Sequence, residues 1–124
     1  MIQGIRLGNV MVDCGDENAL CDFYSKLLGW EKCVLYEQPA VRSDEGVIFL
    51  FVSVEGYTAP VWPEQENKQQ KQMHFDFQVP DLAAAVREAQ ALGAVKAGCQ
   101  FGGDEYISML DPAGHPFCLC ALHS

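Results

Sequence analysis

The stretch LGNVMVDCGDENALCDFYSKLLGW, residues 7–30, decides the fold, because a second stretch of the chain repeats its pattern. The second stretch is QMHFDFQVPDLAAAVREAQALGA, residues 72–94. Each copy has an alternating segment typical of a strand, then an aspartate, then apolar residues at helical spacing, and finally a glycine. A repeat of this length indicates two copies of one supersecondary unit.

The aspartate and the glycine of each copy mark the ends of a predicted helix. Asp16 and Asp81 suit the N-cap position, where a side-chain oxygen accepts hydrogen bonds from free backbone N–H groups. Gly29 and Gly93 suit the left-handed residue that ends a helix. Each predicted helix has one apolar face to bury. The two helices are predicted at Glu17–Leu28 and Leu82–Leu92.

The segments after each helix are β-like, so each copy has a βαβββ order. In the first copy, strands are predicted at Lys32–Glu37 and Val47–Val54, with a turn region from Pro39 to Gly46. In the second copy, strands are predicted at Val95–Gly98, Glu105–Leu110 and Phe117–Leu122. The sequence Asp111-Pro112-Ala113-Gly114 predicts a reverse turn between the last two strands, because Pro and Gly hold its second and fourth positions.

The composition is that of one ordinary globular domain, with 124 residues, 49% of them hydrophobic and 20% charged. Eight basic against 17 acidic residues give a net charge of −9, and no basic stripe is present. Nucleic acid is therefore excluded as a partner. The sequence shows neither a membrane-length apolar run nor a signal-peptide pattern, so we expect a cytoplasmic protein without a membrane partner.

Six cysteines occur without a CxxC motif, and the chain has enough large apolar residues to build a core without disulfides. We expect free thiols that pack as small hydrophobic side chains. The cysteines are residues 14, 21, 33, 99, 118 and 120.

A polar stretch, Glu55–Gln72, joins the two copies. The expected organisation is a single domain, with module one at about 1–56, a linker at about 57–72 and module two at about 73–124. Trp62 lies in this linker between two prolines, where no core pattern requires a tryptophan. Its ring could form a lid over an apolar ligand, or it could cover a sheet edge or a dimer contact.

Two motifs, DENALCDFYSKLLGW at 16–30 and DPAGHPFCL at 111–119, resemble the vicinal oxygen chelate superfamily of glyoxalases, bleomycin-resistance proteins and dioxygenases. The chain is most similar to its glyoxalase-like branch, which carries a PxWP linker and a GHPFCL final strand. The resemblance implies an α+β fold in which two tandem βαβββ modules form a curled mixed sheet around a shared cavity, with the helices outside. It also implies a homodimer, because paired-module members commonly dimerise.

Strand alternation, combined with the implied cavity, selects the residues that face a ligand. On the first strand of module one these residues are Asn9, Met11 and Asp13, and on the first strand of module two they are His74, Asp76 and Gln78. On the last strand of module two, Cys118 and Cys120 face the same side. The expected ligand-binding residues are Asn9, Met11, Asp13, Leu50, Trp62, His74, Asp76, Gln78 and Cys118.

Metal-dependent members of the superfamily hold a divalent ion on four side chains, commonly His or Gln, Glu, His and Glu. The resemblance carries these positions to Asn9, Leu50, His74 and Cys118. Leucine cannot act as a ligand, and both carboxylates are missing, so we expect no metal and no other cofactor. A divalent ion, if one binds, would lie at His74, Cys118 and Asp76; Cys120 could add a second sulfur to a zinc site.

His74, Asp76 and Cys118 are the candidate catalytic residues, although each has a simpler interpretation. His74 can be a histidine of the cavity wall that is hydrogen-bonded to a neighbour, or a ligand or general base oriented by Asp76. Cys118 can be a buried apolar side chain, or a nucleophile whose pKa His74 lowers. The other two histidines are expected to be exposed and either structural or inert; His115 belongs to the predicted turn and His123 to the chain end.

The missing carboxylates favour a metal-independent small-molecule binding protein similar to bleomycin-resistance proteins, and the acidic net charge favours a neutral or cationic ligand. The alternative is a lyase, an isomerase or a dioxygenase-like enzyme, acting on a small vicinal-oxygen substrate with a non-standard divalent metal site at His74. A third interpretation is a protein-binding module without a ligand.

Overall fold

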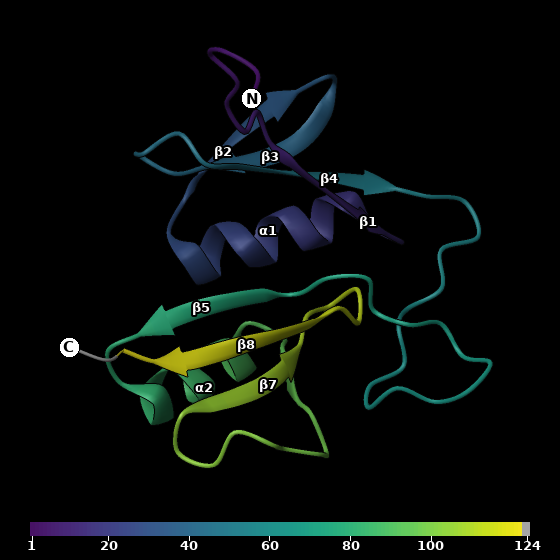
Figure 1. The fold of residues 1–124 in the computed structure, drawn as a ribbon, viewed down its shortest axis with the longest axis vertical. Coiled ribbons are helices and arrows are strands. Elements are labelled where there is room, and N and C mark those ends of the chain that lie inside the picture. The colour runs from purple at the N-terminus through teal and green to yellow at the C-terminus, as the bar shows by residue number, and fades with distance from the viewer. Residues whose placement is uncertain (123–124) are drawn as a thin grey trace. The chain divides into compact units, whose positions relative to one another are not determined.

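The computed structural model describes residues 1–122 and has two units of the same α+β architecture (Figure 1). The chain divides between Tyr57 and Thr58. Each unit contains one helix and one four-stranded mixed sheet, so the predicted α+β class and the two βαβββ modules are confirmed. The sheets are not closed. A cavity shared by the two modules stays a prediction.

The two units have the same strand order. The first contains β1 (Val10–Cys14), α1 (Glu17–Leu28), β2 (Glu31–Leu35), β3 (Gln38–Arg42) and β4 (Ile48–Ser53), in the sheet order β1-β4-β3-β2. The second contains β5 (Phe75–Val79), α2 (Leu82–Ala91), β6 (Val95–Lys96), β7 (Tyr106–Leu110) and β8 (Pro116–Ala121), in the order β5-β8-β7-β6. In each sheet the first strand runs parallel to the last, and the other pairs are antiparallel. Within residues 1–122, neither helix is long and apolar enough to cross a membrane.

Both predicted helix N-caps are present. Asp16 Oδ1 accepts a hydrogen bond from the Ala19 backbone N–H at 3.0 Å, and Asp81 Oδ1 accepts one from Ala84 N–H at 3.1 Å. At the other end of α1, Gly29 adopts the predicted left-handed conformation with φ of 69°. The helix α2 ends at Ala91, one residue earlier than predicted, with Leu92 as its cap, and Gly93 follows with φ of 113°.

The predicted turn region from Pro39 to Gly46 is wrong in its first part, because β3 occupies Gln38–Arg42. The chain reverses earlier, at Tyr36 and Glu37, which have φ of 51° and 64°. Two successive positive φ angles are typical of the type I′ turn in a tight hairpin, but this turn usually contains glycine or asparagine. Pro39 is tolerated in β3 because the pairing with β4 begins only at the next residue.

Each helix packs on one face of its own sheet and covers an apolar core. In the first unit the Tyr24 ring is fully buried and stacks on Phe51, with ring centroids 5.7 Å apart. In the second unit Phe117 is fully buried and meets Phe77 edge to face at 6.0 Å. Burial of these aromatic side chains supplies much of the hydrophobic stabilisation of each unit.

The reverse turn predicted between β7 and β8 is also present. Gly114 N–H donates to the Asp111 carbonyl oxygen at 2.8 Å, and Gly114 has φ of 86°. The buried Asp111 carboxylate accepts hydrogen bonds from the N–H groups of Ala113 and His115, at 2.9 Å and 3.0 Å. His115 is half-buried rather than exposed, because its backbone completes this turn. His123, also expected to be exposed, lies outside the described residues.

Candidate functional site

The candidate site is built on the neighbouring parallel strands β5 and β8 of the second unit. Their register places Asp76 opposite Cys118 and Gln78 opposite Cys120. Phe75 on β5 is half-buried, whereas Asp76 is exposed, as the alternation of the sequence predicts. The same alternation points Cys118 to the side of the sheet that carries Asp76, away from α2.

A pocket of about 360 Å³ lies over this face. Every residue that lines it belongs to the second unit. The walls combine aromatic side chains with a few polar groups, which is the usual composition of a small-molecule site. The lining residues are Trp62, Lys71, His74, Asp76, Phe101, Tyr106, Ser108, Pro116, Cys118 and Cys120.

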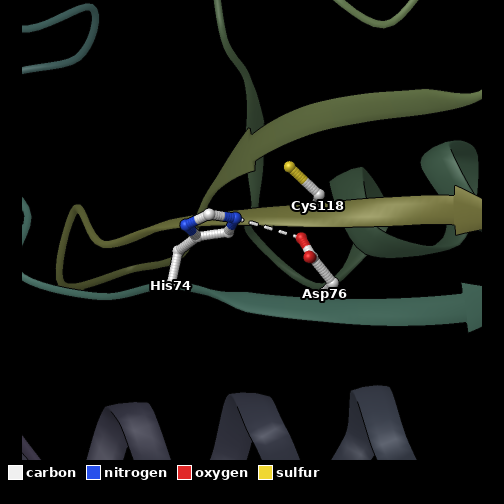
Figure 2. Close-up of side chains that lie close together, drawn as sticks. All are labelled: His74, Asp76 and Cys118. Carbon is white, nitrogen blue, oxygen red and sulfur yellow. Dashed lines mark ion pairs between the residues drawn. The ribbon is translucent and has the colours of Figure 1, made fainter.

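His74, Asp76 and Cys118 converge in this pocket (Figure 2). The imidazole Nε2 of His74 lies 3.1 Å from Asp76 Oδ1, a distance that makes an ion pair when the imidazole is protonated. One donor atom from each of the three residues lies within 4.8 Å of the other two. The structure therefore brings together the three candidate catalytic residues, which the sequence places up to 44 positions apart.

The Cys118 side chain is buried, and burial is the main cause that raises the pKa of its thiol. The negative charge of Asp76 raises this pKa further, whereas the Ser108 hydroxyl, 3.6 Å from Cys118 Sγ, lowers it. Burial also raises the pKa of the neighbouring Cys120 thiol. A thiol with a raised pKa is a weak nucleophile at neutral pH, so this environment does not favour the predicted nucleophilic role of Cys118.

The outer wall of the pocket is aromatic. The indole ring of Trp62 meets Phe101 edge to face, with ring centroids 6.2 Å apart. Lys71 Nζ lies 4.6 Å from the centre of the Trp62 ring and 3.4 Å from Glu64 Oε1. The indole Nε1 is buried without a hydrogen-bond partner. This arrangement supports the interpretation of Trp62 as part of a ligand pocket.

Of the other expected ligand residues, Gln78 is the one that belongs to the second unit, and it does not line this pocket. Gln78 lies on β5 two residues beyond Asp76, and the other expected residues lie in or beside the first unit's strands. The contribution of these first-unit residues to ligand binding stays a prediction; they are Asn9, Met11, Asp13 and Leu50.

Six lining residues were not among the expected ligand-binding residues. Of these, Cys120 was expected on the same side of its strand as Cys118, and the other five were not expected in the site: Lys71, Phe101, Tyr106, Ser108 and Pro116. Tyr106 and Ser108 are two residues apart in the predicted strand Glu105–Leu110, so the sequence predicts that their side chains share one face of it. The sequence does not predict which strand pairs with this one, and therefore it does not predict that the face borders the pocket. Lys71 and Phe101 come from irregular segments that carry no periodic signal.

The four positions that correspond to the superfamily's metal ligands do not fit a hard divalent ion. Leu50 is fully buried and has no donor atom, and Asn9 offers only a neutral amide. Cys118 supplies sulfur where such an ion needs a carboxylate oxygen. The donor set of the usual four-ligand site is therefore absent from these positions.

Comparisons with known proteins agree with this architecture. The model of the glyoxalase-like domain family matches residues 9–120. A solved glyoxalase/bleomycin resistance protein/dioxygenase family enzyme from Burkholderia phytofirmans PsJN has a TM-score of 0.73 at 16% identity, covering 96% of this chain and 100% of that one. A glyoxalase/dioxygenase from Nostoc punctiforme has a TM-score of 0.68 at 16% identity, with coverages of 96% and 92%.

A glyoxalase/bleomycin resistance protein from Albidiferax ferrireducens T118 has a TM-score of 0.64 at 18% identity, covering 94% of this chain and 98% of that one. At these identities the likeness shows the fold and not the activity. No curated protein sequence matches the chain. The family match spans most of the chain and agrees with the two βαβββ modules, so the chain belongs to the glyoxalase-like domain family of the vicinal oxygen chelate superfamily.

Proposed function

We propose that the protein binds a small organic molecule in the pocket of the second unit, and that it does so without the superfamily's four-ligand metal. The observation that carries this proposal is the pocket itself. Its volume of about 360 Å³ is in the range of small-molecule sites, roughly 300–1,000 Å³. Its walls offer flat aromatic surface beside a small number of polar atoms.

The pocket favours a planar, neutral or cationic ligand. The rings of Trp62, Phe101 and Tyr106 can contact a flat apolar body. Asp76 and Ser108 can accept hydrogen bonds from hydroxyl or amino groups at the edge of such a body. The net charge of −9 adds a weak preference against strongly anionic compounds.

A thermal-shift screen of the EDTA-treated protein tests the proposal, because a compound that binds only the native state raises the unfolding temperature. The panel contains catechols, aromatic amines and small hydroxy ketones. We expect a compound from this panel to raise the midpoint of the wild type, and to raise it less in His74→Ala. His115→Ala is the matched control, since it removes a histidine that does not line the pocket.

Two results would contradict the proposal. One is a panel that shifts no midpoint. The other is a ligand-dependent shift that His115→Ala reduces as much as His74→Ala does. A collapse of the unliganded stability of His74→Ala would indicate that His74 is a structural residue, and it would also contradict its assigned place in ligand binding.

The contact between His74 and Asp76 favours a second candidate function, that of an isomerase or lyase. A carboxylate 3.1 Å from the imidazole can hold the ring in a fixed orientation, as a general base requires. Such an enzyme would exchange a carbon-bound proton of a bound hydroxy ketone with solvent. Proton NMR in D₂O separates the two functions, because a binding protein would leave the carbon-bound proton in place.

A further inference from the structure

The cluster of His74, Asp76 and Cys118 combines imidazole, carboxylate and thiol donors in one small volume. Asp76 lies on β5 and His74 directly precedes that strand, whereas Cys118 lies on the adjacent β8, opposite Asp76 in the strand register. Figure 2 shows the three side chains on the same face of this strand pair. All three residues belong to the second unit.

The geometry is close to that of a three-ligand site for a tetrahedral ion. Zinc ligand bonds of about 2.0–2.3 Å place neighbouring donors of a tetrahedron roughly 3.3–3.8 Å apart. His74 Nε2 and Asp76 Oδ1, at 3.1 Å, are already near this range, and all three donors lie within 4.8 Å. A contraction of about 1 Å would therefore complete the set.

Metal binding would require movement of the His74 and Asp76 side chains, and both are free to rotate. The side chains of His74 and Asp76 are 36% and 60% exposed, so rotation about their χ angles disturbs no packing in the core. Cys118 is 9% exposed and is held in the sheet. The Cys118 sulfur therefore keeps its position, and the His74 and Asp76 side chains can rotate toward it.

The donor types decide the class of ion. Thiolate and imidazole prefer borderline or soft metals such as Zn²⁺, whereas Mg²⁺ and Ca²⁺ require sets of oxygen ligands. One thiolate and one carboxylate would also balance the charge of a divalent ion, with His74 as the neutral ligand. The site faces the pocket, so a fourth position would remain open to water or to a small molecule.

We propose that His74, Asp76 and Cys118 form a binding site for a thiophilic divalent cation of the Zn²⁺ type, built entirely by the second unit. The site differs from the superfamily's four-ligand arrangement in its carboxylate position, in its sulfur ligand and in the absence of ligands from the first module. It goes beyond the proposed function, because the ion needs no organic ligand to bind.

Titration of the reduced, EDTA-treated full chain with Co²⁺ tests the proposal. A thiolate ligand gives a charge-transfer band in the near ultraviolet, and a tetrahedral site gives strong visible bands. We expect both bands to saturate at one Co²⁺ per chain, Zn²⁺ to abolish them, and Mg²⁺ in excess to leave them unchanged.

Variants assign the ligands. Removal of a residue that only hydrogen-bonds to a metal ligand weakens metal binding about 10- to 100-fold, and removal of the ligand itself costs more. We therefore expect Cys118→Ser, Asp76→Asn and His74→Ala each to weaken Co²⁺ binding by about 100-fold or more. Cys99→Ser is the matched control, because it removes an exposed thiol outside the pocket, and it should bind Co²⁺ like the wild type.

Several results would overturn the proposal: no charge-transfer band at stoichiometric Co²⁺, displacement of Co²⁺ by Mg²⁺, or a band that survives Cys118→Ser and disappears in Cys120→Ser or Cys99→Ser. The metal titration contains no organic ligand, and the ligand screen is done in EDTA. Failure of the metal site and failure of the proposed small-molecule function are therefore separate results.

Discussion

The substitution Asp111→Ala should lower the free energy of unfolding of the second unit, and by far more than removal of an ordinary surface carboxylate would. Asp111 is 4% exposed, and its carboxylate accepts hydrogen bonds from the N–H groups of Ala113 at 2.9 Å and His115 at 3.0 Å. A hydrogen bond to a charged group contributes about 1.5–3 kcal/mol, so two such bonds correspond to about 3–6 kcal/mol. Because the two N–H groups are only partly buried, water replaces part of each bond, and we expect a loss of about 3 kcal/mol.

Thermal unfolding followed by circular dichroism measures this loss. For a chain of this size, about 3 kcal/mol corresponds to a decrease of roughly 10 °C in the midpoint. Asp111→Asn is the matched variant, because its amide oxygen can still accept both hydrogen bonds, and it should lose less than half as much. A midpoint of Asp111→Ala within about 2 °C of the wild type would refute the reasoning. Equal losses in the two variants would show that charge, and not the acceptor geometry, holds the turn.

Four further predictions concern helix ends, thiols, charge and assembly. Asp16→Ala and Asp81→Ala should each reduce the free energy of unfolding by about 1 kcal/mol in urea titrations, and unchanged midpoints would contradict the capping role. Cys99, which is exposed, should react with iodoacetamide before the buried thiols, as peptide mass spectrometry can show. The pKa of Asp22 is lowered to about 2, below its ordinary value of 3.8, mainly by a hydrogen bond from Lys26 and next by one from Lys32. The pairing therefore stabilises the fold above pH 3.8 and is lost as the pH falls through about 2. Asp22→Asn should accordingly lower the thermal midpoint at pH 7 but not at pH 2, and equal effects at both pH values would contradict this. Light scattering over a dilution series should give about twice the chain mass of 13.7 kDa, whereas a monomer mass at every concentration would contradict the expected homodimer.

The parts of the fold that depend on local chemistry could be predicted from the sequence. Asp16 and Asp81 identify the helix starts because short acceptor side chains satisfy free N–H groups there. The turn at Asp111 could be predicted because Pro and Gly restrict its backbone. The strand β3 could not be predicted, because the turn before it consists of Tyr36 and Glu37 at positive φ. Neither residue type is typical of such a turn, so the sequence does not indicate it.

The candidate site could be predicted only in part, because alternation gives the face of a strand but not its neighbour. The alternation predicted for residues 74–78 placed His74 and Asp76 on one side of the chain, and both line the pocket, although β5 itself begins at Phe75. The meeting of Asp76 and Cys118 depends on the register between β5 and β8, which long-range packing decides. The approach of Phe101 to Trp62 joins two irregular segments, and no periodicity in either one indicates it.

The central claim is that ligand recognition takes place in the pocket of the second unit. The most direct test is a titration of the isotope-labelled, EDTA-treated protein with a compound that raises its unfolding temperature, followed through the backbone amide signals in two-dimensional NMR. We predict saturable shifts concentrated in residues 71–76, 106–108 and 116–120, which carry most of the pocket lining. Saturable shifts that leave these segments unchanged and fall elsewhere, for example on the exposed side of α2, would contradict the account.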